Sequence, residues 1–426
     1  MAANLLQVSY QLVDSFWIGN LLGARALGAV AISSVIAVTA LSFVMGMNNA
    51  ALAILSQQRG RDDAQGLKDY LNAFVVIMFL TALALGVLGY LNAHRVLQVL
   101  GTPEEIMPAA QTYLQVTFLG ILFLFGYNFI STILRALGDS KTPLRFVTVA
   151  VLLNMGLDPL FISGFDLGID GAAYATVLSQ GISFIYGLAY VLRKKLAPLQ
   201  APKPPTREQT GKILRLGIPS GLQMAVITGG SAAVMSVVAS FGPDVVGGFG
   251  AAQRLDSLIM LPAQALGIAV SSMAGQNIGR GNWARVGEIS RVAVVYNLAV
   301  MISIALIVIA VARPAISVFI DETASVEFGV KYVRLIALCY PFLGINFVLN
   351  GVVRAAGAMY QVLVLNFVSF WVLRFPLTWV AAGIFGDTGI AVGIGSSFVV
   401  SSLVAFMYFR YGKWRQIQLF EEPPAR

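Results

Sequence analysis

Cysteine and histidine are almost absent from this sequence, which has one cysteine, Cys339, and one histidine, His94, in 426 residues. A lone cysteine cannot form a disulfide within the chain, and it excludes thiolate metal sites. Clustered His, Cys and acidic ligands, which a membrane enzyme would need, are also missing. We therefore expect no metal, no cofactor and no enzymatic activity. His94 falls in "NAHRV", where we expect a solvated turn residue rather than a proton carrier.

Charged residues are scarce as well, at 11% against 58% hydrophobic residues, with a mean hydropathy of +0.79. This balance predicts an integral membrane protein. The short alternating strands of a membrane barrel are absent, so the chain should be all-α. Apolar stretches long enough to cross a bilayer predict about twelve transmembrane helices, at 1–22, 26–56, 68–97, 106–137, 143–164, 168–192, 209–241, 245–277, 287–318, 326–356, 360–385 and 389–411.

The net charge of +8 is spread over the ends of the predicted spans. Basic residues follow the even-numbered spans, whereas turns on the other side, such as "FGPDVV" and "FGDTG", are acidic or neutral. By the positive-inside bias both termini face the cytoplasm. Because the basic residues form no single patch, the expected partner is the lipid bilayer and not nucleic acid.

The sequence repeats itself at one fixed spacing. "SQQRGRDDA" at 56–64 matches "GQNIGRGNW" at 275–283, and "LRALGD" at 134–139 matches "VRAAGA" at 353–358. Both pairs are 219 positions apart, as Arg61 and Arg280 show. The repeat predicts two pseudo-symmetric six-helix lobes of parallel topology. We place the lobes at 1–192 and 209–426, joined by a cytoplasmic linker at 193–208 that is rich in Pro and Lys.

Acidic residues inside the first lobe have no acidic counterpart in the second. In the fifth span, "LLNMGLDPLFI", Pro159 matches Pro376, but Asp158 matches Phe375. In the first span, Asp14 matches Gly230. A carboxylate in a membrane span is costly, so it usually faces an interior or a watery cavity and marks a pathway. We therefore predict Asp14 and Asp158 as proton-binding or cation-coupling residues, with a structural hydrogen bond as the alternative.

Four further polar residues form the predicted supporting cluster and cavity: Asn154, Thr176, Tyr10 and Gln7. Asn154 lies one turn before Asp158 on the same helix face, and Thr176 lies on the next, antiparallel helix. Each also has a structural alternative. Asn154 could simply join helices, Thr176 could bond a carbonyl of its own helix, and Tyr10 could merely pack. Gln7 matches Gln223 in the second lobe, which favours helix packing.

Arg254 and Asp256 lie two positions apart within the eighth span. Side chains at that spacing do not share a helix face. We therefore expect each of them to pair with other helices in a structural role.

These features resemble the multidrug and toxic compound extrusion (MATE) family, and its DinF-like branch most of all. The resemblance rests on "SYQLVDSFWIG" in the first span, "LDPLFI" in the fifth, and the twin "QQRGR" and "QNIGR" loops. It implies a monomeric antiporter of the bacterial inner membrane that exports organic cations by alternating access. It also implies that Asp14 and Asp158 couple export to protons or sodium, with Asn154 and Thr176 in support.

One departure from the family concerns its NorM-like branch, which places sodium-binding acids in the second lobe. Here the seventh span, "GLQMAVITGGSAAVMSV", and the tenth, "YPFLGINFVLNGVV", contain no acid. We therefore expect export of lipophilic cationic drugs in exchange for protons, with sodium as the alternative ion. A flippase for a lipid-linked precursor is the rival function, but it needs basic residues for a pyrophosphate, and the spans offer few beyond Arg254 and Arg374. A channel is disfavoured because the polar cluster occupies one lobe.

Overall fold

The computed structural model describes residues 2–420, apart from the side chains at 2–5, 7–16, 19, 20, 23–25, 27 and 35 of the first helix. Over this range the chain is helical, and no strand occurs in it. Nine helices are long and apolar enough to cross a membrane, or eleven spans if each of two bent helix pairs counts as one. These spans match all the predicted ones after 1–22, whose side chains are mostly outside the description. The prediction of an all-α membrane protein is confirmed.

The chain divides into two compact units, Ala2–Ile218 and Pro219–Arg426, which we call the first and second lobes. The boundary between these units falls inside one helix, at Pro219, and not in the loop that precedes that helix. The first lobe contains α1 (Ala2–Gly60), α2 (Ala64–Val99), α3 (Met107–Leu119), α4 (Ile121–Ala136), α5 (Thr142–Pro159), the π-helix η1 (Leu160–Gly164), α6 (Gly168–Lys194) and the start of α7 (Arg207–Ala239).

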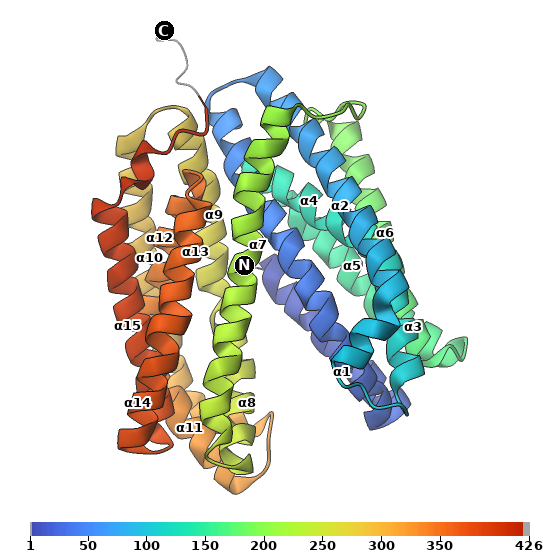
Figure 1. The fold of residues 1–426 in the computed structure, drawn as a ribbon, viewed down its shortest axis with the longest axis vertical. Helices are drawn as coiled ribbons and strands as arrows, with labels where there is room; N and C mark the ends of the chain where they lie inside the picture. The colour runs from blue at the N-terminus through green and yellow to red at the C-terminus, as the bar shows by residue number, and fades with distance from the viewer. Residues whose placement is uncertain (1, 421–426) are drawn as a thin grey trace. The chain divides into compact units, whose positions relative to one another are not determined.

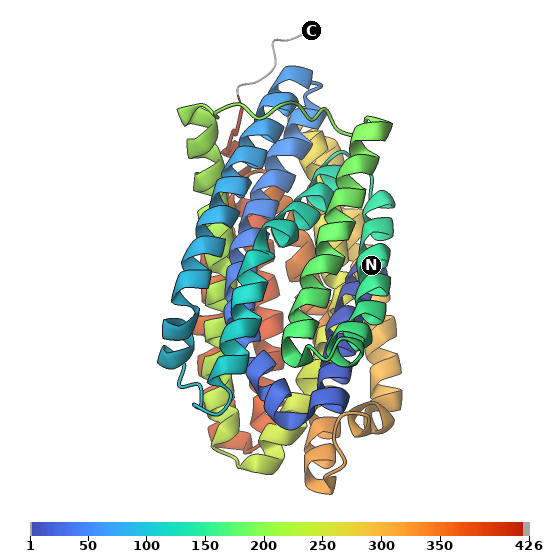
Figure 2. The same ribbon diagram turned by 90° about the vertical axis from the view of Figure 1, so that its right-hand side faces the viewer.

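Helix α1 contains the first two predicted spans. Its 59 residues would extend about 90 Å if straight, roughly three times the thickness of the hydrocarbon core. Figure 1 shows its ribbon reversing direction near the lower end of the first lobe. The loop between α6 and α7 crosses the basic end of this lobe in an extended form (Figure 2). Asn72 of α2 fixes the loop there, because its amide group exchanges two hydrogen bonds with the backbone of Lys203.

The second lobe contains the remainder of the chain. Its elements are α8 (Pro243–Ile259), α9 (Leu261–Gly279), α10 (Trp283–Ser317), α11 (Thr323–Ala337), α12 (Tyr340–Ala355), α13 (Met359–Phe367), the π-helix η2 (Val368–Arg374), α14 (Phe375–Phe385), α15 (Thr388–Tyr411) and the short 3-10 helix η3 (Lys413–Gln416).

Large apolar side chains remain exposed on the helix surfaces of both lobes. Examples are Leu91, Ile307 and Trp379, which are 69%, 61% and 66% exposed. Exposure on this scale is what a lipid-facing surface requires.

Local backbone geometry repeats at the spacing found in the sequence. Asp62 and Gly281, 219 positions apart, both have positive φ, at 59° and 72°. The next residues, Asp63 and Asn282, both cap a helix with their side chains. The third and fourth helices of the first lobe meet at a bend of 47° beside Gly120, and α11 and α12 meet at 55° beside Cys339. The repeat is therefore carried by turns and bends as well as by residue identity.

The sequence had suggested that His94 lies in a turn, and this prediction is wrong. It belongs to α2, which continues to Val99, and its Nδ1 lies 3.0 Å from Oε1 of Gln111. The apolar residues around it extend the helix beyond the predicted end of the span. The side chain is exposed, as expected.

Candidate functional site

The two polar residues of the fifth span form a direct pair in the first lobe. Nδ2 of Asn154 donates a hydrogen bond of 2.8 Å to Oδ1 of Asp158. Both side chains are completely buried, at 0% exposure. The spacing of four residues on α5 places them on one face, as predicted. An ionisable side chain inside a membrane span is costly, is usually paired, and often marks a functional pathway.

The helix becomes irregular directly after this pair. Pro159 ends α5, and the wider π-helix η1 begins at Leu160. A proline cannot donate a backbone hydrogen bond to the preceding turn, so the regular ladder is interrupted here. Such π-helical turns are frequent at functional sites, because they free backbone groups and redirect side chains. Asp158 therefore occupies the last turn of α5, directly before this irregular segment.

Two buried oxygen atoms on α5 and α6 lack hydrogen-bond partners among the described residues. They are Oδ1 of Asn154 and Oγ1 of Thr176 on α6. Thr176 thus does not bond a carbonyl of its own helix, contrary to its structural alternative. Helices α5 and α6 are held together nearby, where Ser183 donates to the backbone oxygen of Phe146 at 2.6 Å. The site therefore has polar atoms available for an ion, a proton or a water.

The side chains of Asp14, Tyr10 and Gln7 lie outside the described ones. Their helix can nevertheless be placed, because Trp17 and Ile18 follow Asp14 within one turn and belong to a buried apolar cluster. That cluster includes Ile162 of η1 and Ala172 of α6. The segment of α1 after Asp14 thus packs on the same elements that follow Asp158 and contain Thr176.

The corresponding positions of the second lobe are filled by aromatic rings. A Cβ atom added to Gly230, the counterpart of Asp14, would lie 2.7 Å from Cβ of Phe370. Gln223 joins helices there, because its Nε2 donates to the backbone oxygen of Met359 at 3.3 Å. This contact agrees with the interpretation of the matched glutamines as packing residues.

A second buried polar cluster, in the second lobe, was largely missed by sequence reasoning. Asp256 of α8 accepts a hydrogen bond from the hydroxyl group of Tyr340 and a longer one, of 3.5 Å, from that of Tyr332. Arg374 lies within electrostatic reach of this carboxylate. Asp256 thus pairs with other helices, as expected, whereas Arg254 is exposed. The role of the two tyrosines could not be predicted from the sequence. Nothing in an apolar span distinguishes a tyrosine that donates a hydrogen bond to a distant acid from one that only packs.

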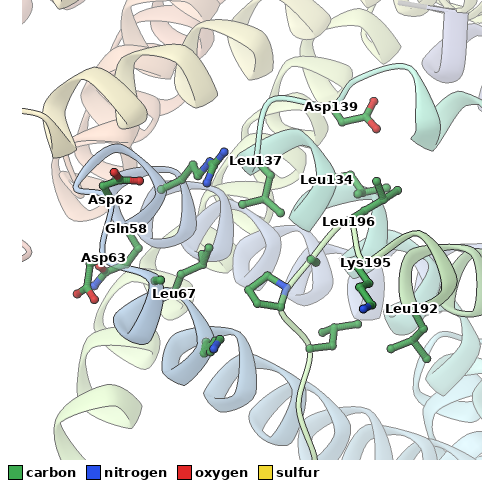
Figure 3. A pocket seen from close by; sticks show the side chains of 16 residues that line it. Gln58, Asp62, Asp63, Leu67, Leu134, Leu137, Asp139, Leu192, Lys195 and Leu196 are labelled. Carbon is green, nitrogen blue, oxygen red and sulfur yellow. The ribbon is translucent and has the colours of Figure 1, made fainter.

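A cavity of the first lobe is lined by residues other than Asn154 and Asp158. It is a crevice of about 740 Å³ where α1, α2, α4 and α6 reach their basic ends. Figure 3 shows leucine side chains of several segments converging on it, with Asp62 and Asp63 at one edge. Asp139, also at its rim, accepts hydrogen bonds from the backbone groups of Lys141 and Thr142. Partial burial raises the pKa of Asp139, but hydrogen bonds from Thr142 and Lys141 outweigh it and lower the pKa overall. Two acids at the crevice, Asp63 and Asp139, thus already accept hydrogen bonds from backbone groups of their own turns.

Comparison with known proteins identifies the family. The MatE family model matches residues 1–160 and 219–380, so the chain belongs to the MATE family of membrane transporters. It is 58% identical to the "Probable multidrug resistance protein YpnP" of Bacillus subtilis, over 99% of this chain and 95% of that protein. It is 24% identical to "Multidrug export protein MepA" of Staphylococcus aureus, over 95% of this chain and 89% of the relative.

The fold agrees with solved structures of the family. The crystal structure of a mutant of the Vibrio cholerae MATE transporter VcmN matches with a TM-score of 0.92, at 23% identity. The match covers 97% of this chain and 94% of that one. Its membership of the MATE family makes the protein a multi-pass membrane transporter of small molecules and not an enzyme, as predicted.

Proposed function

We propose that this protein exports lipophilic organic cations as a secondary antiporter, driven by protons that bind Asp158 and Asp14. The observation that carries the proposal is the completely buried pair of Asn154 and Asp158 beside a helix irregularity. A carboxylate in that position changes its charge when it binds a proton, which changes the relative stability of two conformations. The names of the relatives, a multidrug resistance protein and a multidrug export protein, support drugs as the exported compounds.

Protons are favoured over sodium by the ligands available. A sodium site recruits several oxygen ligands, whereas the described part of this site offers one carboxylate, one amide oxygen and one hydroxyl. Binding of one proton needs only the carboxylate and a partner that tolerates both charge states. Asn154 is such a partner, because an amide can donate to the ionised form and accept from the neutral one. Thr176, Tyr10 and Gln7 are proposed to line the same cavity, and no metal or cofactor is needed.

A cationic substrate fits a lobe in which Asp158 is a completely buried carboxylic acid. An apolar cavity containing carboxylates attracts lipophilic cations, because it offers both burial and charge compensation. Binding of the proton and of the drug would favour different conformations, which gives alternating access. We further propose a monomer in the bacterial cytoplasmic membrane, with both termini in the cytoplasm because the basic ends of the helices lie on that side.

The test is transport by purified protein in liposomes under imposed gradients. Efflux of tetraphenylphosphonium, a lipophilic cation, should follow a proton gradient at equal sodium on both sides. Efflux that continues after the proton gradient has collapsed, and that follows sodium instead, would overturn proton coupling. Failure to move the cation under either gradient would overturn the antiporter itself.

A flippase for a lipid-linked precursor is not favoured. A pyrophosphate carries several negative charges and is usually bound by a group of Arg and Lys residues. In the spans, Arg254 is exposed and Arg374 lies beside Asp256, which offsets its charge. Neither arginine belongs to a basic cluster among the described residues.

A further inference from the structure

We propose that Arg374 of the second lobe forms a subsite for the carboxylate of aromatic compounds, including drugs that carry a cationic group as well. The inference rests on the proposed function, because the subsite would serve exported molecules. Its basis is the guanidinium group of Arg374, which has aromatic neighbours and hydrogen-bond donors to spare.

The guanidinium group is held in place by two aromatic rings and one hydroxyl group. Its carbon lies 3.8 Å from the ring centre of Phe370 and 4.8 Å from that of Phe398. Nε donates to Oγ of Ser397 on α15 at 3.3 Å. These contacts fix the plane of the group, which is the requirement for recognition of a planar carboxylate.

The terminal nitrogen atoms of Arg374 are not used by a protein carboxylate. Among the described residues, no acid lies within the 4.0 Å of an ion pair with this arginine. Asp256 is close enough to offset the charge, but it is hydrogen-bonded to Tyr332 and Tyr340 instead. The Arg374 side chain as a whole is partly exposed. A single carboxylate suits this balance better than a multiply charged phosphate.

A second polar side chain of this segment lies one turn further along, on the same helix face. Thr378 of α14 has a completely buried hydroxyl group with no hydrogen-bond partner among the described residues. Its backbone touches α15 at Gly393, one turn before Ser397, because a Cβ on that glycine would lie 2.3 Å from Cα of Thr378. Arg374 and Thr378 thus share the face of their helix that packs on α15.

Two exposed aromatic side chains of the same segment offer an apolar surface on which an aromatic ligand can pack. Phe367 and Trp371 of η2 and the preceding turn are stacked with their ring planes 16° apart, and they are 48% and 39% exposed. Trp371 is anchored by its Nε1, which donates to the backbone oxygen of Val226 at 3.0 Å. An aromatic compound can pack on these rings while its carboxylate faces the guanidinium group.

Arg374 and Phe370 lie next to the positions that correspond to the predicted acids of the first lobe. Arg374 directly precedes Phe375, the counterpart of Asp158, and its ring partner Phe370 covers Gly230, the counterpart of Asp14. Each lobe thus has an ionisable group near the proline of its fifth span, but the charges have opposite signs. The arginine also ends a π-helical turn, a feature that is often retained at functional sites.

The test compares an ionised and an uncharged naphthalene derivative by equilibrium dialysis with the purified full-length protein at pH 7. The probes are 2-naphthoate, which is ionised, and 2-naphthylmethanol, which is not. We expect the wild-type protein to bind the carboxylate about tenfold more tightly, and Arg374→Gln to lose that preference. Arg374→Lys should keep part of it. Arg254→Gln, which removes an exposed arginine of the same lobe, should keep all of it.

Equal binding of the two probes by the wild-type protein overturns the inference, and that measurement does not depend on whether any variant folds. An unchanged preference in Arg374→Gln, or a loss as large in Arg254→Gln, also overturns it. Binding of tetraphenylphosphonium in the same preparations separates the two proposals. If the cation binds and the carboxylate does not, only the subsite fails, whereas loss of cation binding in the wild-type protein contradicts the proposed function.

Discussion

Asp63 and Asn282, 219 positions apart, accept equivalent hydrogen bonds at the start of a helix. Oδ1 of Asp63 accepts from the backbone N–H of Gly66 at 2.8 Å, and Oδ1 of Asn282 accepts from that of Arg285 at 3.0 Å. The two residues differ in charge but occupy the same place in their lobes. A side-chain cap is therefore part of the repeated architecture and not a feature of one lobe.

Removal of either cap should destabilise the protein by a similar amount. We expect Asp63→Ala and Asn282→Ala each to lower the free energy of unfolding by about 0.5–2 kcal/mol, because one backbone donor loses its partner. Unfolding in mixed detergent micelles with increasing denaturing detergent would measure the change. Asp62→Gly is the control, since φ is +59° there and the counterpart is already Gly281. A loss in the control as large as in the cap variants would count against this explanation.

Two glycines set the distance between α9 and α12. A Cβ atom on Gly351 would lie 2.5 Å from the backbone oxygen of Gly267, which cannot move without its helix. Gly351→Ala should therefore separate the helices and cost roughly 1–3 kcal/mol, typical of overpacking. Gly250→Ala is the matched control, because its Cβ would meet nothing within 4 Å. Its midpoint in the same unfolding assay should be unchanged or slightly higher, since alanine favours helix.

The turn before α5 should show a pH dependence. Partial burial raises the pKa of Asp139, but hydrogen bonds from Thr142 and Lys141 leave it lowered overall. A lowered pKa means that the ionised form stabilises the folded state at neutral pH, and that this contribution is lost as the pH falls through the lowered value. Asp139→Asn should thus reduce the melting temperature at pH 7.

The difference between the wild type and Asp139→Asn should shrink as the pH drops below about 3.9, the usual value for aspartate. Ser140→Ala, at the exposed neighbour, should show no such trend. A difference that stays constant down to about pH 3 would mean that the carboxylate charge at Asp139 has no part in stability.

The span positions could be predicted because the bilayer imposes a minimum apolar length, and the polar residues between spans mark the ends. The interruptions within spans could not. The bends beside Gly120 and Cys339 and the π-helices η1 and η2 leave the hydrophobic pattern unchanged, since nearly every residue around them is still apolar or small. A proline such as Pro159 interrupts a helix, but it does not specify the wider turn that follows it.

The candidate site also has one part that could be predicted from the sequence and one part that could not. Asn154 and Asp158 could be paired from sequence because they are local, four residues apart on one helix. The cluster around Asp256 could not, because its hydroxyl donors are 76 and 84 residues away on two other helices. The repeat identifies the acids that are missing from the second lobe, but it carries no signal for the arginine beside Phe375.

Asp158 offers the sharpest test of the proposed function, because its counterpart Phe375 provides a control within the same protein. We expect Asp158→Asn to keep the fold and the approximate shape of the site, since the new amide can still accept the hydrogen bond from Asn154. The variant cannot ionise, so the change of charge that couples proton binding to conformation is removed. Proton-driven efflux of tetraphenylphosphonium from liposomes should therefore be lost, while the unfolding midpoint changes little.

Phe375→Asn places an amide in the apolar counterpart position. It should cost about 1–3 kcal/mol of stability if the amide finds no partner, and it should leave proton-driven efflux largely intact. We therefore expect opposite outcomes for the two variants. Asp158→Asn should lose transport at nearly constant stability, whereas Phe375→Asn should lose stability at nearly constant transport. Efflux by Asp158→Asn at the wild-type rate, with equal protein in the membrane, would show that Asp158 is a structural partner of Asn154 and not the coupling residue.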